Sequence, residues 1–352
     1  MDRRRFLKNS LAGAVGAMSG MPLSAGAQPT RRFIYCSWGG ALQEMEKKAF
    51  IEPFFLQKGI AFNETSPTTY AKLKAQVEAK AVEWDLVTVG GQWLYQGGKE
   101  GLLEDIDYNI VHADHLGASW KAKNGVYSST GSTVIAFNTD SLPTEKAPKT
   151  WADFWDVKKF PGQRSMYSRM YYNYEAALRA AGVPADQLYP ATEERVRLMF
   201  QKMEEIKPHV TVWWTSGAQP LQLLATGEVS AAMAWSGRVA DAQKGGAPVD
   251  MIFNDGIVWG NVFVVPKGSP YKNLAMEAIN YVISEKAQDR LLDLGVYAPV
   301  LEASARRANA EQARLLVTHP DNLKGAIIFN DEQSAGYIAK YERDWQKFQL
   351  QK

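Results

Sequence analysis

The chain has 352 residues, enough for two domains, since single hydrophobic cores stop growing at roughly 250–300 residues. Residues of the set AVILMFWYC make up 46% and charged residues 22%, an ordinary globular balance that excludes a disordered chain, a collagen-like chain and a coiled coil. With one cysteine, neither an internal disulfide nor a four-cysteine zinc site is possible. The formal charge of +2 leaves no basic footprint for nucleic acid, and we expect no such partner.

Residues 1–27 have the features of an export signal. Arg3, Arg4, Arg5 and Lys8 precede a short, glycine-interrupted apolar run, and Ala25-Gly26-Ala27 matches an A-x-A cleavage site. The paired arginines predict a twin-arginine-type signal peptide that is removed before Gln28. A membrane anchor is the alternative, but it needs about 20 continuous apolar residues. Without this segment 36 basic and 37 acidic residues remain, a charge of −1, and we expect a soluble protein outside the cytoplasm.

Strands and helices alternate along the first part of the remaining chain. The periodicity predicts strands over 32–37, 60–64 and 84–89 and helices over 41–57 and 68–81. Such a β-α-β-α-β run predicts an open-sheet unit with parallel strands and right-handed crossovers. Further on, the segment 126–138 reads as two short strands around Gly131, and the turn-rich segment 143–155 begins a new region.

A second α/β unit follows this region. Strands are predicted over 164–168, 210–214, 231–235 and 259–266, and helices over 172–181, 192–206, 219–226 and 274–294. The chain from Glu302 onward is mainly helical, with Gly and Pro breaks. We therefore expect two lobes with a cleft between them: residues 28–137 and 262–305 form lobe 1, residues 138–261 form lobe 2, and residues 306–352 form C-terminal helices on either lobe.

Five predicted strand ends share one chemistry. In open α/β sheets, ligands bind beyond the carboxyl ends of the strands, where N–H groups at helix starts are free. Here those ends are rich in Trp, Ser, Gly, Arg and Gln: 37–40, 90–92, 168–169, 214–216 and 235–238. We interpret this shared chemistry as one ligand cleft rather than as ordinary loops.

Catalytic motifs are scarce. The sequence contains no G-x-S-x-G, no H-E-x-x-H and no G-x-x-x-x-G-K-[ST] pattern. His112 and His115, with Asp114 between them, could bind a metal on one helical turn. A polar surface segment is the favoured interpretation, because no third ligand lies nearby in the sequence. A chain with a cleft but few general bases points to binding rather than catalysis.

Several segments resemble the periplasmic solute-binding proteins of ABC importers, and the spermidine/putrescine-binding family in particular. The resemblance covers about residues 33–307 and is carried by Ser37-Trp38-Gly39-Gly40 with Gln43, Trp84-Asp85-Leu86-Val87, Thr150 to Trp155, Lys159-Phe160-Pro161-Gly162, Gly227-Glu228-Val229, Met233 to Gly237, Ile257-Val258-Trp259, Val265-Pro266 and the helix before Gly295. It implies a two-lobed periplasmic binding protein fold of type II, hinged by crossing strands that close on the ligand. It also implies a monomer in the periplasm that is not an enzyme, needs no cofactor or metal, and has ABC permease subunits as partners.

The resemblance also assigns roles to residues. Trp38, Trp235 and Trp259 fall where polyamine binders place aromatic walls around an alkyl-ammonium chain. The acidic positions of that family fall instead on Arg169, Tyr172 and Asn261. An ammonium group would then meet a guanidinium where it needs a carboxylate, which argues against a plain polyamine.

Our hypothesis is therefore a carboxylate-bearing or zwitterionic solute, derived from an amino acid or opine-like. Arg169, with Arg238 as a second candidate, would hold the carboxylate. The complete expected ligand site is Ser37, Trp38, Gly39, Gly40, Gly90, Gly91, Gln92, Ser168, Arg169, Tyr172, Trp214, Ser216, Trp235, Ser236, Arg238, Trp259 and Asn261. Core packing is the alternative role for tryptophans, above all for Trp84, Trp151 and Trp155. Three other functions stay open: polyamine binding, ferric-ion binding through Tyr171 and Tyr172, and an exported metal-dependent enzyme.

Overall fold

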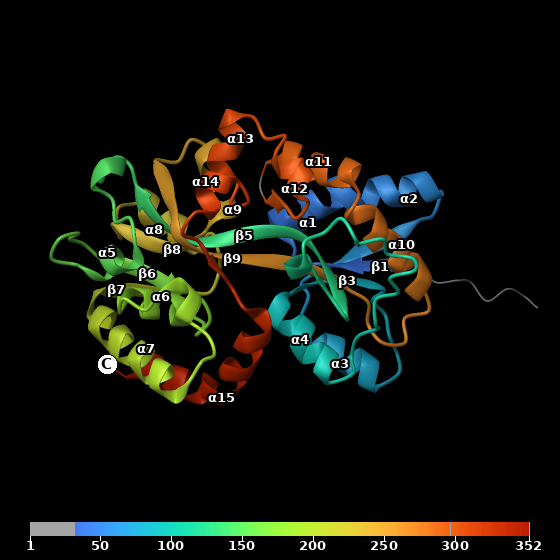
Figure 1. The fold of residues 1–352 in the computed structure, drawn as a ribbon, viewed down its shortest axis with the longest axis horizontal. Coiled ribbons are helices and arrows are strands. Elements are labelled where there is room, and N and C mark those ends of the chain that lie inside the picture. Colours follow the sequence, from blue (N-terminus) through green and yellow to red (C-terminus); the bar gives the residue numbers. More distant parts are fainter. Residues whose placement is uncertain (1–31, 296, 352) are drawn as a thin grey trace, which may run out of the picture. The chain divides into compact units, whose positions relative to one another are not determined.

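A computed structural model describes residues 32–295 and 297–351, so the predicted signal peptide lies outside the described residues. The described part is a mixed α/β structure around one sheet, with strand order β2-β1-β3-β9-β5-β8-β6-β7 (Figure 1). The strands of this path are β1 (Phe33–Cys36), β2 (Phe62–Thr65), β3 (Leu86–Gly90), β5 (Gly125–Asn138), β6 (Arg164–Tyr167), β7 (Val210–Trp214), β8 (Ala231–Trp235) and β9 (Val249–Val264). Three short strands pair with β5 or β9: β4 (Lys121–Ala122), β10 (Ala298–Pro299) and β11 (Ile327–Ile328).

The helices lie between and after these strands. The helices up to β6 are α1 (Gly40–Glu46), α2 (Glu52–Lys58), α3 (Tyr70–Glu78), α4 (Gly91–Lys99) and α5 (Trp151–Trp155). Those between β6 and β9 are α6 (Asn173–Ala180), α7 (Glu193–Ile206), α8 (Gln219–Ala225) and α9 (Ser236–Lys244). Those after β9 are α10 (Lys272–Val282), α11 (Glu285–Leu294), α12 (Glu302–Ala305), α13 (Ala310–Leu315), α14 (Pro320–Leu323) and α15 (Asp331–Leu350).

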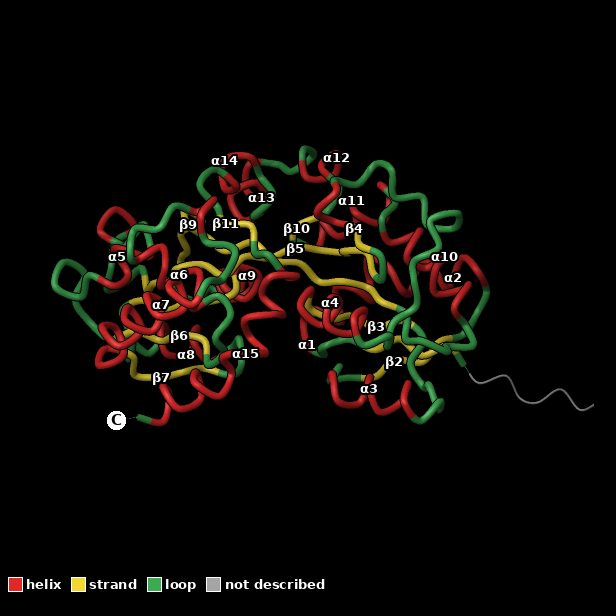
Figure 2. Tube along the Cα trace, turned by 60° about the horizontal axis from the view of Figure 1, so that its bottom comes forward, coloured by secondary structure: helices red, strands yellow, loops and turns green. Residues whose placement is uncertain are grey.

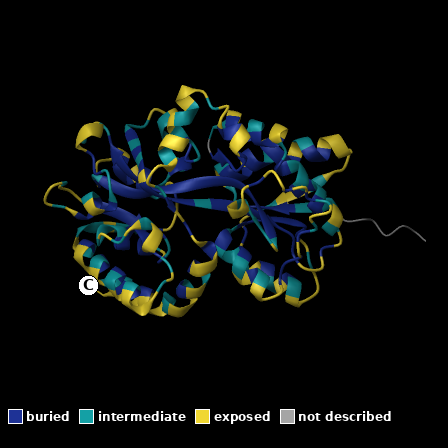
Figure 3. Ribbon diagram, in the orientation of Figure 1, coloured by how far each residue is buried: buried dark blue, intermediate teal, exposed yellow. Residues whose placement is uncertain are grey.

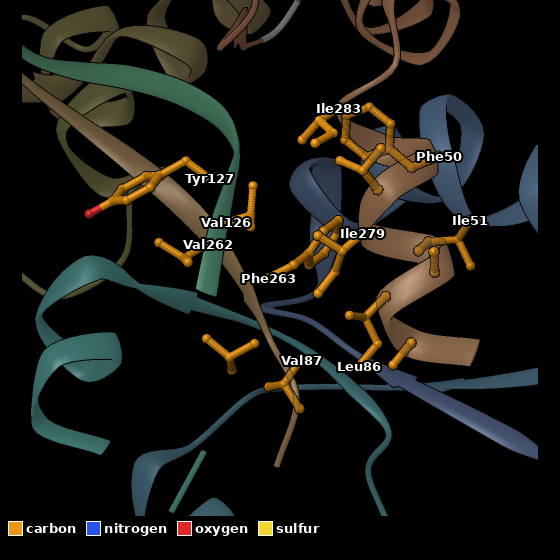
Figure 4. Packing of buried hydrophobic residues seen from close by; sticks show 14 of the residues in the cluster. Phe50, Ile51, Leu86, Val87, Val126, Tyr127, Val262, Phe263, Ile279 and Ile283 are labelled. Atoms are coloured by element: carbon orange, nitrogen blue, oxygen red, sulfur yellow. The ribbon is translucent and has the colours of Figure 1, made fainter. Parts of the chain in front are cut away.

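The first lobe contains the predicted β-α-β-α-β unit. Strand β1 lies between β2 and β3 and pairs with both in parallel. The predicted helix over 41–57 is α1 and α2 joined by a π-helical turn, Lys47–Ile51. Apolar side chains of that turn, such as Phe50, pack against Phe263 of β9 and Ile279 of α10 in the hydrophobic core of this lobe (Figure 4).

Two long strands, β5 and β9, join the lobes. They pair antiparallel from Val126 opposite Phe263 to Asn138 opposite Val249. One end of β9 pairs with β3 of the first lobe, and the far half of β5 pairs with β8 of the second. Both strands cross the middle of the views in Figures 1 and 2 and are almost wholly buried (Figure 3). These are the crossing strands that the resemblance implies.

The predicted pair of short strands around Gly131 is wrong, because β5 runs through this glycine unbroken. Gly131 is opposite Trp259 in the ladder, and a Cβ at Gly131 would lie 2.7 Å from the indole ring. The glycine therefore permits a close approach and does not end the strand. Strand β9 also begins ten residues earlier than predicted, because a register shift opposite Thr133 to Ile135 absorbs the turn-like residues 254–256.

The second lobe repeats the parallel arrangement. Strand β6 lies between β7 and β8 and is parallel to both. Its core contains the indole rings of Trp151 and Trp214 together with side chains of α6 and α7. The predicted helix over 274–294 is in fact two helices, since α10 ends at Val282 and the Ser284 hydroxyl caps α11 by accepting a hydrogen bond from the Ala287 N–H (3.4 Å).

The last helix, α15, contacts both lobes. Its first residue, Asp331, accepts a hydrogen bond from the Tyr127 hydroxyl of β5 (2.8 Å), and its start packs on α4. Farther along, Trp345 and Phe348 join the core of the second lobe. No helix within the described residues is long and apolar enough to span a membrane.

Candidate ligand-binding site

A cavity of about 290 Å³ lies at the carboxyl ends of the strands, between the two lobes. It is lined by Trp38, Gly39, Leu42, Gly90, Gln92, Tyr167, Tyr171, Tyr172, Trp235, Arg238, Trp259, Gly260, Asn261, Tyr297 and Asp331. These residues come from the ends of β1, β3, β6 and β8, from β9, from the segment after α11 and from the start of α15. A larger hollow of about 560 Å³ lies between α7 and α15, but it is an open surface groove edged by charged side chains. The strand-end cavity is the better candidate for a ligand site.

Tight turns bring the backbone to this cavity. Gly39 and Gly40 have φ angles of 82° and 61°, in a region that other residues rarely adopt, so the chain turns directly from β1 into α1. The N–H of Gly39 donates to the side-chain oxygen of Gln43 (3.1 Å). The Arg238 guanidinium lies on the other side of this turn, since a Cβ at Gly40 would be 3.6 Å from its Nη2 atom.

Aromatic rings form most of the wall. Trp259 lies 6.2 Å from Trp235 and 6.3 Å from Tyr172, measured between ring centroids. Its indole N–H donates to the Thr133 hydroxyl (3.0 Å), which fixes the ring against the crossing strands. Tyr172 has a φ of 67°, a strained value for a non-glycine residue, and its N–H donates to the buried Glu175 carboxylate (2.8 Å). This wall can pack methylene groups and attract a cation.

Arg238 is the cation at the cavity. Its side chain is half-buried, and within the described residues it makes no hydrogen bond or ion pair. The Nε atom is fully buried without a partner. Because a desolvated guanidinium needs an acceptor, this unpaired side chain is suited to bind an anionic group.

Asp331 is the acid at the cavity. Its carboxylate accepts hydrogen bonds from the Tyr127 hydroxyl and from the backbone N–H of Gln92 at the start of α4. Gly91 makes room for it, since a Cβ there would lie 2.1 Å from the carboxyl carbon. Burial, together with the nearby Glu175 carboxylate, raises the pKa of Asp331 to about 7, although the hydrogen bonds from Tyr127 and Gln92 favour the ionised form.

A second buried carboxylate, Glu46, lies close to the glycine turn that lines the cavity. Glu46 of α1 accepts hydrogen bonds from the hydroxyls of Tyr35 (2.5 Å), Ser37 (2.7 Å) and Thr88 (3.0 Å). Burial raises the pKa of Glu46 to about 7, although the three hydroxyl hydrogen bonds favour the ionised form. The network joins the ends of β1 and β3 to α1, so it positions the glycine turn that lines the cavity.

Some of the predicted site residues line this cavity and others do not. Those that line it are Trp38, Gly39, Gly90, Gln92, Tyr172, Trp235, Arg238, Trp259 and Asn261. Those that do not are Ser37, Gly40, Gly91, Ser168, Arg169, Trp214, Ser216 and Ser236.

The residues outside the lining have other contacts. The Arg169 side chain is 58% exposed, its Nη1 atom lies 3.7 Å from Glu342 of α15, and it does not line the cavity. Trp214 is fully buried, and its indole N–H donates to the Met233 carbonyl (2.9 Å). The Ser37 hydroxyl donates a hydrogen bond to Glu46, and the Ser236 hydroxyl accepts one from the Ser132 N–H (3.0 Å). Ser216 is exposed, and the Ser168 carbonyl accepts from the Trp345 indole (2.9 Å).

Sequence reasoning missed several lining residues: Leu42, Tyr167, Gly260, Tyr297 and Asp331. Tyr167 could have been found, because it ends β6 directly beside the strand end that the sequence indicated. Asp331 carries no local signal, since only the path of α15 across the lobes brings it to the cavity.

The segment with the two histidines is hydrogen-bonded to α10 and to the residue that follows this helix. His115 Nε2 lies 2.8 Å from the Ile283 carbonyl, and the backbone N–H of His112 donates to the Asn280 side chain (2.9 Å). Among the described residues, no group of three or more His, Cys, Asp or Glu side chains is arranged to hold a metal ion.

Comparison with known proteins gives the family. Residues 49–317 match the family described as bacterial extracellular solute-binding protein. A gamma-aminobutyric acid-binding protein from Pseudomonas aeruginosa is 33% identical over 327 residues, 90% of each chain. The structure of an ABC transporter substrate-binding protein from Bradyrhizobium japonicum is 34% identical, with a TM-score of 0.85 over 91% of this chain and 99% of that one. The PBP MotA from A. tumefaciens B6, solved with glucopine, is 29% identical, with a TM-score of 0.82 over 91% of this chain and all of that one.

This chain therefore belongs to the bacterial extracellular solute-binding protein family, with the two-lobed fold of periplasmic binding proteins. Its relatives and structural neighbours are substrate-binding proteins of ABC transporters, and the chain is one that captures a small organic solute.

Proposed function

We propose that this solute-binding protein captures a small carboxylate-bearing or zwitterionic solute, derived from an amino acid or opine-like, and delivers it unchanged to an ABC permease. It acts as a receptor and not as an enzyme. The predicted signal peptide supports a place in the periplasm. Ligand binding would shift the two lobes toward the closed arrangement, and the permease would take the solute from there.

The main support for this proposal is the unpaired guanidinium of Arg238 at the cavity. A half-buried guanidinium without a hydrogen-bond or ion-pair partner among the described residues lies at a cavity whose walls are mostly aromatic. Guanidinium groups bind carboxylates with two parallel hydrogen bonds, and the low dielectric of such a cavity strengthens them. The role first given to Arg169 thus passes to Arg238, which was the second candidate.

A relative named for gamma-aminobutyric acid and a neighbour solved with glucopine support the same chemical class. A plain polyamine fits less well. Its second ammonium group would have to lie beside Arg238, and Asn261 offers an amide where a carboxylate would serve a diamine.

Thermal-shift screening followed by calorimetry tests the proposal. The panel contains 4-aminobutyrate, 5-aminovalerate, glucopine, glutamate and putrescine, and each hit is incubated with the protein and analysed by mass spectrometry. We expect a carboxylate-bearing member to raise the melting temperature and to be recovered unchanged. Binding of putrescine alone would contradict the proposed ligand class, and conversion that a chelator abolishes would contradict the receptor role. Iron in the natively purified protein, found by elemental analysis, would favour the ferric-ion alternative.

A further inference from the structure

We propose that Asp331, the first residue of α15, binds the ammonium group of the ligand, and that the solute is therefore a small zwitterion held by both Arg238 and Asp331. This inference rests on the proposed function, in which Arg238 binds the carboxylate. It adds a second charged contact from a helix that the strand-end pattern does not include.

The placement of Asp331 is the first argument. It lines the cavity, its residue is 8% exposed, and Gly91 leaves the space that its carboxyl group occupies. Its hydrogen-bond partners, the Tyr127 hydroxyl and the Gln92 N–H, are both neutral. No Lys, Arg or His among the described residues forms an ion pair with it. A buried carboxylate of this kind needs a cation when it ionises, and the ligand can supply one.

The relation to Arg238 is the second argument. The two side chains line one cavity but do not form an ion pair with each other. Arg238 lies beside Gly40 and Gly217, whereas Asp331 lies beside Gly91. A solute that satisfies both must therefore carry an anionic and a cationic group.

The aromatic wall of the cavity is the third argument. Trp259 and Tyr172 line the cavity beside Asp331, and their ring planes are nearly parallel, at 27°. Such faces pack methylene groups and add to the attraction for an ammonium group. The volume of about 290 Å³ is small for a ligand site, which favours a short chain.

Other ligand classes leave one charge unsatisfied. A diamine places a cation against Arg238, and a dicarboxylate places an anion against Asp331. Each of these mismatches leaves like charges facing each other in a desolvated cavity.

The test compares D331N with E332Q. Glu332 is the exposed neighbour in the same turn of α15 and does not line the cavity, so E332Q is the matched control. The probes are 4-aminobutyrate and butyrate, which lacks only the ammonium group, with calorimetry for the first and competition at millimolar concentration for the second. We expect D331N to weaken 4-aminobutyrate binding at least 30-fold and to leave butyrate binding unchanged or stronger. E332Q should change neither affinity more than twofold.

The outcomes separate this inference from the proposed function. If D331N binds 4-aminobutyrate as the unmodified protein does, or if it loses both probes equally, the role of Asp331 is refuted while Arg238 can still bind the carboxylate. If the unmodified protein binds butyrate and 4-aminobutyrate equally, the ammonium contact is refuted as well. If it binds no carboxylate at all, both proposals fail.

Discussion

Replacing Arg238 by alanine is the most informative perturbation of the cavity. In the structure this guanidinium has no ion-pair partner among the described residues, so its removal breaks no ion pair within the protein. Two unit charges 4 Å apart attract by about 4 kcal/mol at an effective dielectric constant of 20. Truncating one partner of a buried, hydrogen-bonded charge pair costs about 2–5 kcal/mol. We therefore expect R238A to weaken the binding of a carboxylate ligand by about 30-fold to several thousand-fold.

Calorimetric titration with the tightest carboxylate from the ligand screen measures this effect. R238K keeps the charge but loses the planar fork, and we expect an intermediate loss of about tenfold. R169A is the matched control, because the Arg169 side chain is 58% exposed, lies near Glu342 and does not line the cavity. It should change the affinity less than twofold. An R238A protein that is folded by circular dichroism and binds within threefold of the unmodified protein would refute the reasoning, as would a loss of binding in R169A.

Three further predictions concern the acid, its neighbours and the core. An ammonium ligand needs Asp331 ionised, and the pKa of this carboxyl is about 7. Calorimetry should therefore show that the affinity for 4-aminobutyrate falls about tenfold from pH 8 to pH 6. D331N should not show this fall. The stability of the ligand-free protein should change in the opposite direction and fall as the pH rises. A carboxyl pKa raised above its unfolded value stabilises the fold below about pH 4, and this contribution is lost as the pH rises through 7. G91A should displace the Asp331 carboxyl group, since a Cβ at Gly91 would lie 2.1 Å from the carboxyl carbon, and should weaken 4-aminobutyrate binding at least tenfold. G336A is the control, because its Cβ would meet open space on α15, and it should leave this binding unchanged. W151F removes an indole that is fully buried and donates to the Asp255 carbonyl (2.8 Å). Urea denaturation should show that the free energy of unfolding falls by about 2–3 kcal/mol, while the ligand affinity is unchanged. A loss of affinity would contradict a purely structural role for this residue.

The sequence pattern predicts the parts of the fold that local rules control. The strands that became β1, β2 and β3 and the helices between them follow from alternation and amphipathic spacing, and the structure confirms them. The long strands were mispredicted where a pairing partner decides the conformation. Gly131 reads as a break in isolation, but Trp259 across the ladder needs the space that a glycine leaves. Such an approach depends on residues 128 positions apart and has no local signature.

The site divides in the same way. The glycine turn at Gly39 and the tryptophans at strand ends could be anticipated, because strand ends meet at one edge of a sheet. Which of Arg169 and Arg238 lines the cavity could not be predicted, since both follow predicted strands. Arg238 lies in the first turn of α9 and is directed at the cavity, whereas Arg169 lies in a loop whose tyrosines occupy the wall instead. Asp331 comes to the site only through the tertiary packing of α15.

A crystal structure with bound 4-aminobutyrate tests the central claim most directly. We expect its carboxylate within hydrogen-bond distance of the Arg238 guanidinium and its amino group within hydrogen-bond distance of the Asp331 carboxylate, with the methylene chain against Trp259. Electron density for the ligand in another hollow, or in the reverse orientation, would contradict the account.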